Sequence, residues 1–174
     1  TATISISAFK NLSSVDASSI EDNEQLTLLQ MAEQAEDDGK LEEAVEWFRV
    51  LMSKYGATAE LHFSLAELLY RLGDTSAARE RYYAAIEMDQ EFVEARANLG
   101  CVLLETGQLE LAIAAFEGVL VLNEEFPEVH YHLARALDES GFPDRANQHW
   151  RRFTELAPHS PWSVEAQERL ESSV

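Results

Sequence analysis

Histidines, a cysteine and carboxylates are the side chains of this sequence that could do chemistry. His130 and His132 stand two residues apart, which places them on different faces of a helix, and His62 lies far from both in the sequence. Histidine ligands on a helix are usually spaced so that they share one face, and no such His or acid spacing occurs here. We therefore expect no metal site, and we interpret the histidines as packing or surface residues.

Catalytic motifs are absent from the sequence as well. Cys101 is the single cysteine, it has no obvious base partner, and a small buried thiol between helices is its simplest interpretation. No Gly-rich phosphate loop, nucleophile elbow or Ser/His/Asp signature is visible. Carboxylates occur throughout the chain, so a pair of them says nothing about catalysis. We expect no enzyme activity, no catalytic residue and no cofactor.

The charge of the chain narrows the choice of partners. The sequence has 32 acidic and 13 basic residues, which gives a net charge of −19. Nucleic acids and anionic membranes both attract Lys and Arg, so we expect neither as a direct partner. A basic protein or peptide would be attracted, although distributed carboxylates are also typical of a solvated surface. With a single cysteine no disulfide can form within the chain, which favours a reducing compartment, and we expect a cytoplasmic protein.

The elements that must position any functional side chain repeat every 34 residues. Each copy has a small residue after a Leu or Met, then a Gly, an Ala and an aromatic residue at fixed offsets. The four copies read Met31-Ala32, Gly39, Ala44 and Phe48; Leu65-Ala66, Gly73, Ala78 and Tyr82; Leu99-Gly100, Gly107, Ala112 and Phe116; and Leu133-Ala134, Gly141, Ala146 and Trp150. A period of this length indicates an architecture of stacked repeats.

Each copy divides into two amphipathic segments. In the third copy Leu99, Val102 and Leu103 follow the i, i+3, i+4 spacing of a helix face, and a second apolar face begins at Leu109. Gly107 separates the segments, and we expect a positive φ there. The sequence therefore predicts a helix hairpin in every copy, with the Ala and aromatic positions packed where helices approach closely.

The chain divides into a tail, four repeats and a capping helix. The predicted ranges are 1–24 for a Ser-rich linker or tail that contains a strand-like alternation, 25–58, 59–92, 93–126 and 127–160 for the repeats, and 161–172 for the cap. We expect Asp22 to cap the first helix and Ser160 to cap the last, with Pro161 in its first turn. Residue 1 is a Thr, so we expect a processed product or a fragment of a longer protein.

With these residues the chain resembles the tetratricopeptide repeat family, whose pattern places Leu-Gly, Ala, Phe and Pro at similar offsets. The resemblance covers residues 25–170. It implies an all-α, right-handed superhelical solenoid of antiparallel helix pairs. There are departures: the large residue near the start of each copy varies, and the closing Pro survives only as Pro158.

The resemblance also implies a function and a site. In that family the first helices of successive repeats line a concave groove that takes a peptide or a helix, so we expect a non-enzymatic scaffold for protein–protein interaction. The predicted groove residues are Glu33, Phe63, Glu67, Tyr70, Asn98, Cys101, Tyr131 and Arg135. Aromatic anchors flanked by carboxylates would suit a segment that carries Lys or Arg. The competing interpretation is that Phe63 and Tyr131 pack between hairpins and that the carboxylates are merely solvated.

A second functional hypothesis comes from the end of the chain. Residues 130–170 are similar to tetratricopeptide segments of bacterial multidomain proteins, in some of which the repeats follow a MerR-type DNA-binding domain. The alternative function is thus a regulatory or oligomerisation arm of a larger bacterial protein, such as a transcriptional regulator. Arg145, Arg151 and Arg152 could pair with the acidic surface of a second copy, or form surface ion pairs of little energy.

Overall fold

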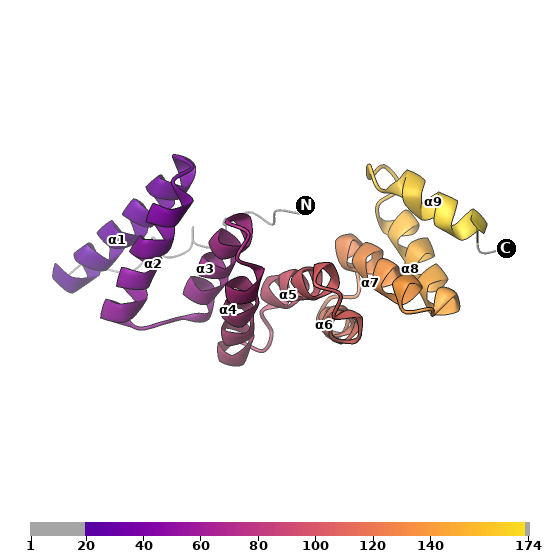
Figure 1. The fold of residues 1–174 in the computed structure, drawn as a ribbon, viewed down its shortest axis with the longest axis horizontal. Coiled ribbons are helices and arrows are strands. Elements are labelled where there is room, and N and C mark those ends of the chain that lie inside the picture. The colour runs from indigo at the N-terminus through magenta and orange to yellow at the C-terminus, as the bar shows by residue number, and fades with distance from the viewer. Residues whose placement is uncertain (1–19, 173–174) are drawn as a thin grey trace. The chain divides into compact units, whose positions relative to one another are not determined.

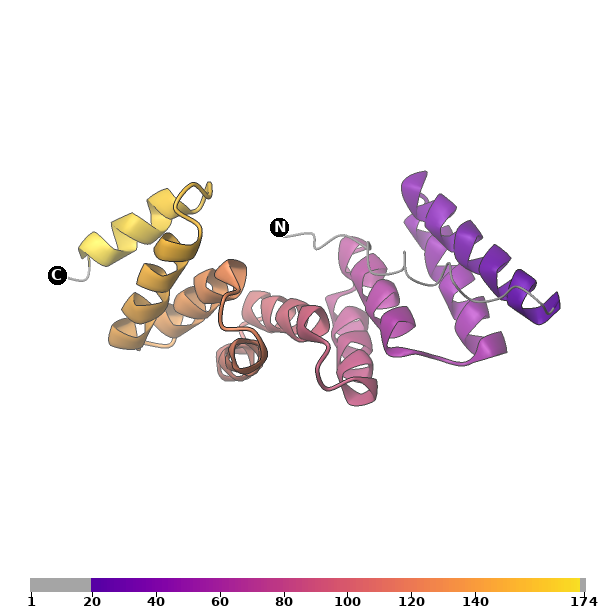
Figure 2. The ribbon, with the colours of Figure 1, turned by 180° about the vertical axis from the view of Figure 1, so that it is seen from behind.

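The computed structural model describes residues 20–172, and every regular element in this part of the chain is an α-helix. The predicted all-α fold class is confirmed. The chain divides into two compact units, unit 1 (residues 1–90) and unit 2 (residues 91–174). Figures 1 and 2 show the helices of both units from opposite sides.

Unit 1 contains two helix hairpins in which the paired helices run antiparallel (Figure 1). Its helices are α1 (Ile20–Asp37), α2 (Leu41–Tyr55), α3 (Ala59–Arg71) and α4 (Thr75–Met88). Both helices of the second hairpin begin with a side-chain cap: Thr58 Oγ1 accepts from the Leu61 amide at 3.3 Å at the start of α3, and Asp74 Oδ1 accepts from the Ala77 amide at 3.0 Å at the start of α4. Helix α2 packs against α3 and joins the two hairpins.

Unit 2 contains two further hairpins and a final helix. Its helices are α5 (Val93–Glu105), α6 (Leu109–Leu122), α7 (Pro127–Glu139), α8 (Pro143–Leu156) and α9 (Ser163–Ser172). Helix α6 packs against α7, and α9 packs against α8. The division of the chain into repeats stays a prediction, although α3, α5 and α7 begin at the residues where the predicted repeats begin.

The hairpin turns are built on glycines, as the sequence predicts. Gly39, Gly73, Gly107 and Gly141 have φ values of 74°, 84°, 73° and 79°. At Gly107 the amide donates to the Leu104 carbonyl and the next amide donates to the Leu103 carbonyl, which satisfies carbonyls at the end of α5. A side chain at this φ would be strained, so glycine is the residue that allows the tight reversal.

The core of each hairpin is made of the repeated small and aromatic residues. Ala44, Ala78, Ala112 and Ala146 are each 0% exposed, and Phe48, Tyr82, Phe116 and Trp150 are at most 2% exposed. Trp150 is accommodated because its indole Nε1 donates to Asp138 Oδ2 at 2.9 Å. The expectation that these positions pack between helices is confirmed.

The two predicted helix caps are wrong. Helix α1 begins at Ile20, so Asp22 lies inside the helix and not in front of it. Helix α9 begins at Ser163, because residues 158–162 form a turn in which the Ser160 hydroxyl accepts from the Trp162 amide at 3.3 Å and the Ser160 carbonyl accepts from the Ser163 amide at 3.0 Å. The strand-like alternation of residues 3–7 lies outside the described residues.

Candidate functional site

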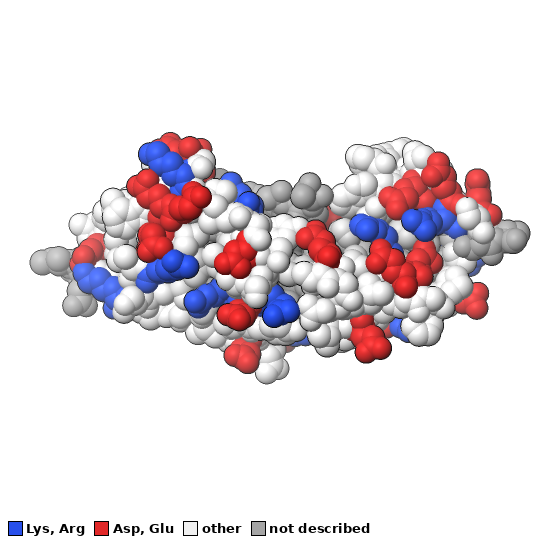
Figure 3. Space-filling view, in the orientation of Figure 1, with Lys and Arg blue, Asp and Glu red and all other residues white. Residues whose placement is uncertain are grey.

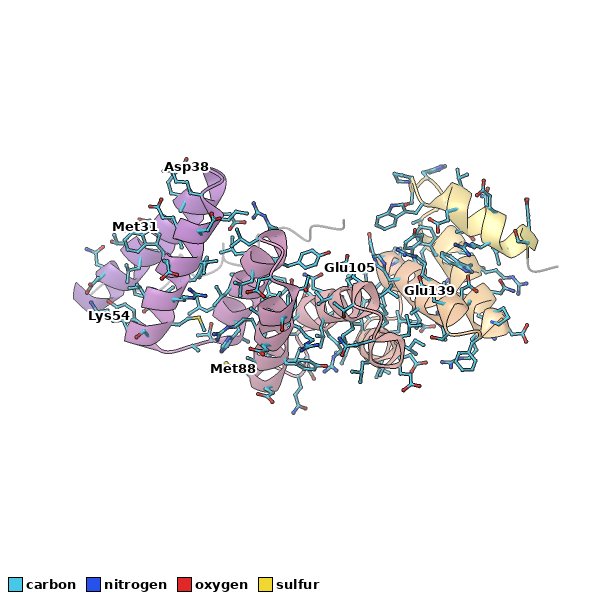
Figure 4. All side chains as sticks on the ribbon, in the orientation of Figure 1. Met31, Asp38, Lys54, Met88, Glu105 and Glu139 are labelled. Atoms are coloured by element: carbon cyan, nitrogen blue, oxygen red, sulfur yellow. The ribbon has the colours of Figure 1, made fainter. Side chains whose placement is uncertain are left out.

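The first helix of each hairpin presents a matched set of side chains, because residues 34 apart occupy the same position of the repeat. In unit 2 these side chains line a pocket of about 270 Å³ between α5 and α7. The lining residues are Cys101, Leu104, Glu105, His132, Arg135 and Glu139. Figure 4 labels Glu105 near the end of α5 and Glu139 near the end of α7. We call this site the unit-2 pocket.

His132 gives the unit-2 pocket an unsatisfied polar wall. Both ring nitrogens are buried and have no hydrogen-bond partner in the described part of the chain. The ring stacks on Phe116 with centroids 5.9 Å apart and an interplanar angle of 13°. Burial and the nearby Arg135 guanidinium lower the pKa of His132 to about 4. The imidazole is therefore neutral at pH 7 and can both donate a hydrogen bond and accept one.

Cys101 is not poised for nucleophilic chemistry. Burial and the Glu105 carboxylate raise the pKa of its thiol to about 12. Reactive cysteines have lowered pKa values, because the thiolate is the nucleophile. Arg135, across the pocket, is half-buried, forms an ion pair with Glu139 at 3.8 Å and lies 6.0 Å from the centre of the Tyr131 ring. The pocket thus offers hydrogen bonding, one cation and a carboxylate rim, which suits binding rather than bond making.

The corresponding positions of unit 1, 68 residues earlier, form a more acidic group. These residues are Glu33, Glu36, Asp37, Ser64, Glu67 and Arg71, and we call them the Glu67 cluster. Arg71 of α3 forms an ion pair with Glu36 of α1, which joins the two first helices. Figure 3 shows carboxylates gathered over the end of α1. Burial, together with Asp37 and Glu36, raises the pKa of Glu33.

Glu67 is the most perturbed carboxylate of this cluster. It is 7% exposed, and its Oε2 atom is buried with no hydrogen-bond partner among the described residues. Burial and the Glu36 carboxylate raise the pKa of Glu67 to about 8, although Arg71 acts in the opposite direction. An uncompensated buried carboxylate is costly, so the empty site holds a proton at neutral pH.

The predicted aromatic residues of the groove lie deeper than an exposed anchor would. Phe63 and Tyr131 are each 5% exposed, and Phe63 packs on Tyr82 with ring centroids 5.9 Å apart. Tyr131 donates a hydrogen bond from its hydroxyl to Glu165 Oε2 at 2.6 Å and stacks on Trp162 at 4.7 Å. Both rings therefore belong to the packed interior and are not exposed anchors. Tyr70 of α3 and Asn98 of α5 are half-buried, and the assignment of all these residues to a groove stays a prediction.

Some residues that line the unit-2 pocket were not predicted from the sequence. Leu104 and Glu139 line the unit-2 pocket and were not predicted, although Glu139 stands one repeat after Glu105 and the 34-residue register could have found it. The contact between His130 and His149 was not predicted from the sequence either. Their Nδ1 atoms are 2.9 Å apart, and nothing in the spacing of the two residues marks them as neighbours.

The histidine pair fixes both ring tautomers. His130 Nε2 lies 2.9 Å from the Glu124 carbonyl oxygen, which can only accept, so this nitrogen carries the proton. Neutral His130 then accepts at Nδ1, and His149 donates to it from its own Nδ1. Burial lowers the pKa of His130, and burial together with His130 and Arg145 lowers the pKa of His149 to about 4. The pair links α7 to α8 as long as one Nδ1 can accept, and the hydrogen bond is lost when both rings are protonated.

The family model of the tetratricopeptide repeat matches residues 63–129. This part of the chain therefore belongs to the tetratricopeptide repeat family. Comparison with curated proteins gives no match. The family assignment made from the sequence is confirmed.

Solved tetratricopeptide repeat structures share the fold. The chain is similar to MamA 41-end from Desulfovibrio magneticus RS-1, with a TM-score of 0.78 and 18% identity, over 84% of this chain and 81% of that one. It is also similar to YrrB, described as a TPR protein with an unusual peptide-binding site, with a TM-score of 0.73 and 18% identity over 79% and 71%. A third similar structure is the Yersinia enterocolitica type III secretion chaperone SycD in complex with a peptide of the translocator YopD, with a TM-score of 0.61 and 25% identity over 65% and 89%.

Between residues 20 and 172, no three His, Cys, Asp or Glu side chains come together in a way that could hold a metal ion. In the same part of the chain, none of the helices has the length and apolar character that crossing a membrane would require.

Proposed function

We propose that this chain is a non-enzymatic interaction scaffold that holds a peptide or helix of a partner protein against its first helices. The observation that carries the proposal is the unit-2 pocket between α5 and α7, whose lining positions recur in unit 1 as the Glu67 cluster. Polar atoms without a partner among the described residues occur at both places, at His132 and at Glu67. Such atoms are costly in an empty site and are completed when a ligand binds.

The similar structures support this kind of partner. YrrB has a peptide-binding site, and SycD was solved with a bound peptide of YopD. The surface chemistry of this chain suits a mixed polar and apolar segment: the carboxylates and Arg135 fix polar groups, and Leu104 offers an apolar contact. A cytoplasmic location, a bacterial source and the lack of nucleic-acid binding stay predictions.

Hydrogen exchange tests the proposal even while the natural partner is unidentified. Peptides selected from a phage-displayed library on the full chain would be added, and exchange of the backbone amides would be measured. We expect protection to concentrate in first helices, α1, α3, α5 or α7. Protection confined to α2, α4, α6 or α8, or a library that yields no binder, would contradict the proposal.

A charge reversal refines the test for peptides that protect unit 2. Arg135→Glu reverses a charge in the wall of the unit-2 pocket, and we expect it to lower the affinity for such peptides by about tenfold. Arg145→Glu on α8 is the matched control, because the exposed fractions of the two arginine side chains are similar, 40% and 48%. Equal effects of the two variants would contradict the placement of the peptide in the pocket.

The second candidate function, an arm that self-associates, is favoured by the outward face of α6. Leu111, Val121 and Leu122 are 50%, 85% and 43% exposed on this helix, whereas α8, the second helix of the next hairpin, has no large apolar residue exposed to this degree. Pairing of this face with the same face of a second copy would bury it symmetrically. Sedimentation of the full chain and of Val121→Lys tests this: a dimer that the substitution disrupts supports the arm, and a monomer at high concentration contradicts it.

A further inference from the structure

Glu67 carries an unmet requirement for a hydrogen-bond donor. Its Oε2 atom is buried and unpaired among the described residues, and the residue is 93% buried, since 7% of its surface is exposed. One turn earlier on α3, the hydroxyl of Ser64 is also buried with no partner in the described part of the chain, and Ser64 is 0% exposed. Residues three apart lie on the same helix face, so the two acceptors can serve one donor group.

The surroundings of Glu67 select the charge of that donor. The nearby cation, Arg71, is already engaged in an ion pair with Glu36. Glu33 and Asp37 of α1 add negative charge beside this pair. Burial together with Asp37 and Glu36 raises the pKa of Glu33, and burial together with Asp37 raises the pKa of Glu36, although Arg71 acts in the opposite direction. An anionic guest would be repelled here, whereas a cation would be attracted and would remove the repulsion between Glu36 and Glu67.

We propose that Glu67 is the binding site for one cationic side chain of the partner, a lysine ammonium or an arginine guanidinium, that enters between α1 and α3. The guest donates hydrogen bonds to Glu67 Oε2 and to the Ser64 hydroxyl, and the fork of a guanidinium suits two such acceptors. This inference rests on the proposed function, and it specifies the kind of partner side chain that unit 1 binds.

The corresponding site of unit 2 would reject the same guest. Arg135 occupies the position of Glu67 there, and His132 occupies the position of Ser64. A cationic side chain would meet the Arg135 guanidinium at the place where unit 1 offers a carboxylate. Recognition of the cation is therefore specific to unit 1, even though both units use the same backbone positions.

Binding of the cation should release a proton. Glu36 on α1 and Arg71 on α3 are the charged groups that act on Glu67, and burial with Glu36 raises its pKa to about 8. At pH 7 the empty carboxyl is mostly protonated, and it must ionise to pair with the guest, so the proton passes to solvent. Affinity therefore rises with pH and levels off above the pKa.

Calorimetry with three blocked pentapeptides tests this on the full chain. The central residue is arginine, lysine or norleucine, flanked by alanines, and the norleucine peptide keeps the length but removes the charge. We expect the arginine and lysine peptides to bind and the norleucine peptide not to bind. Affinity should increase by up to about tenfold per pH unit between about pH 6 and pH 7. The heat of binding should also differ between phosphate and Tris buffers, because the released proton is taken up by the buffer.

Two glutamine variants provide the matched comparison. Glu67→Gln keeps the shape of the side chain and removes the charge, and we expect about tenfold weaker binding of the arginine peptide with no dependence on pH. Glu60→Gln removes an exposed charge from the same helix and should leave binding unchanged. If Glu67→Gln did not fold, the pH dependence and the buffer dependence of the wild-type chain would still decide the question.

The outcomes separate this inference from the proposed function. If the arginine peptide bound Glu67→Gln as tightly as the wild-type chain, or bound without pH dependence, the role of Glu67 would be overturned. Protection of first helices by library peptides would then still support the scaffold. If the library yielded no binder while the arginine peptide bound with the expected pH dependence, the proposed scaffold function would be overturned and the cation site would remain supported.

Discussion

Two glycines inside helices of unit 2 show how one methyl group can have opposite effects. A Cβ on Gly100 of α5 would come within 2.5 Å of the Phe116 ring, which is 0% exposed and cannot move away. A Cβ on Gly118 of α6 would meet only the flexible Arg96 side chain, at 3.1 Å. We expect Gly100→Ala to lower the free energy of unfolding by about 1–3 kcal/mol. Gly118→Ala should raise it by up to about 1 kcal/mol, because alanine is the better helix former.

Urea unfolding of both variants measures these changes, and each serves as the control for the other. Similar destabilisation by both substitutions would show that the close approach of Gly100 to Phe116 is not the reason for glycine at this position.

The histidines of unit 2 make its stability depend on pH. The folded pKa values of His132 and His149 are about 4, below the ordinary value of 6.5, so the unfolded chain takes up protons first as the pH falls. The stabilisation is fully present above about pH 6.5 and is lost as the pH falls towards 4. We expect a loss of roughly 2–4 kcal/mol in the free energy of unfolding over this window.

Urea unfolding at a series of pH values would check the histidine prediction. His132→Phe keeps the stacked ring on Phe116 and removes the titrating group, so its pH dependence should be shallower than that of the wild-type chain. A variant with the same slope as the wild-type chain would contradict the assignment to His132. Titration of the carboxylates is common to both proteins and cancels in this comparison.

Residue by residue, the sequence predicted the packing positions better than the site. The 34-residue register alone identified the buried Ala and aromatic positions, because a repeated core needs the same volumes at the same places. It also led to the positions of Glu67 and Cys101. It could not show that Phe63 and Tyr131 are 5% exposed, or that Oε2 of Glu67 has no partner among the described residues, because both depend on how neighbouring helices pack.

At the scale of helices, α9 completes unit 2 through a small number of contacts. Trp162, just before α9, stacks on Tyr131 of α7 at 4.7 Å, and Glu165 of α9 accepts from the Tyr131 hydroxyl. We expect Trp162→Ala to cost about 2 kcal/mol in unfolding free energy and to increase hydrogen exchange in α9 and α7. Val164→Ala, at an exposed position of the same helix, is the control. Equal exchange in the two variants would mean that α9 is held by other contacts.

Helix ends were harder to predict than helix interiors. The turn glycines have the expected positive φ because no other residue tolerates it well, so a single residue type decides the turn. A helix start has several solutions: α1 already includes Asp22, and the chain between Pro158 and Trp162 makes a turn before α9 begins. Local capping signals cannot choose among such solutions, because the helix start is also set by packing.

At the scale of the whole molecule, the net charge of −19 opposes folding. Carboxylates outnumber cations in the sequence, and self-repulsion of this kind destabilises a folded chain. Salt screens it over about 10 Å at 0.1 M, so we expect the melting temperature to rise by a few degrees between about 0.02 M and 0.2 M sodium chloride. Thermal melts followed by circular dichroism would show this. A melting temperature that falls with salt would mean that the ion pairs contribute more than the repulsion.

Glu33, Glu67, Cys101 and Arg135 occupy one position of the repeat, on a backbone whose buried residues hardly change. An acid, a buried acid, a thiol and a base have thus been accepted at the same place without a new fold. The residue at this position can therefore be exchanged while the buried core that holds the helices is kept. Substitution of Arg135 by glutamate would place the carboxylate of unit 1 in unit 2 as well. Binding specificity could thus be changed by substitutions at this position, without a change of the fold.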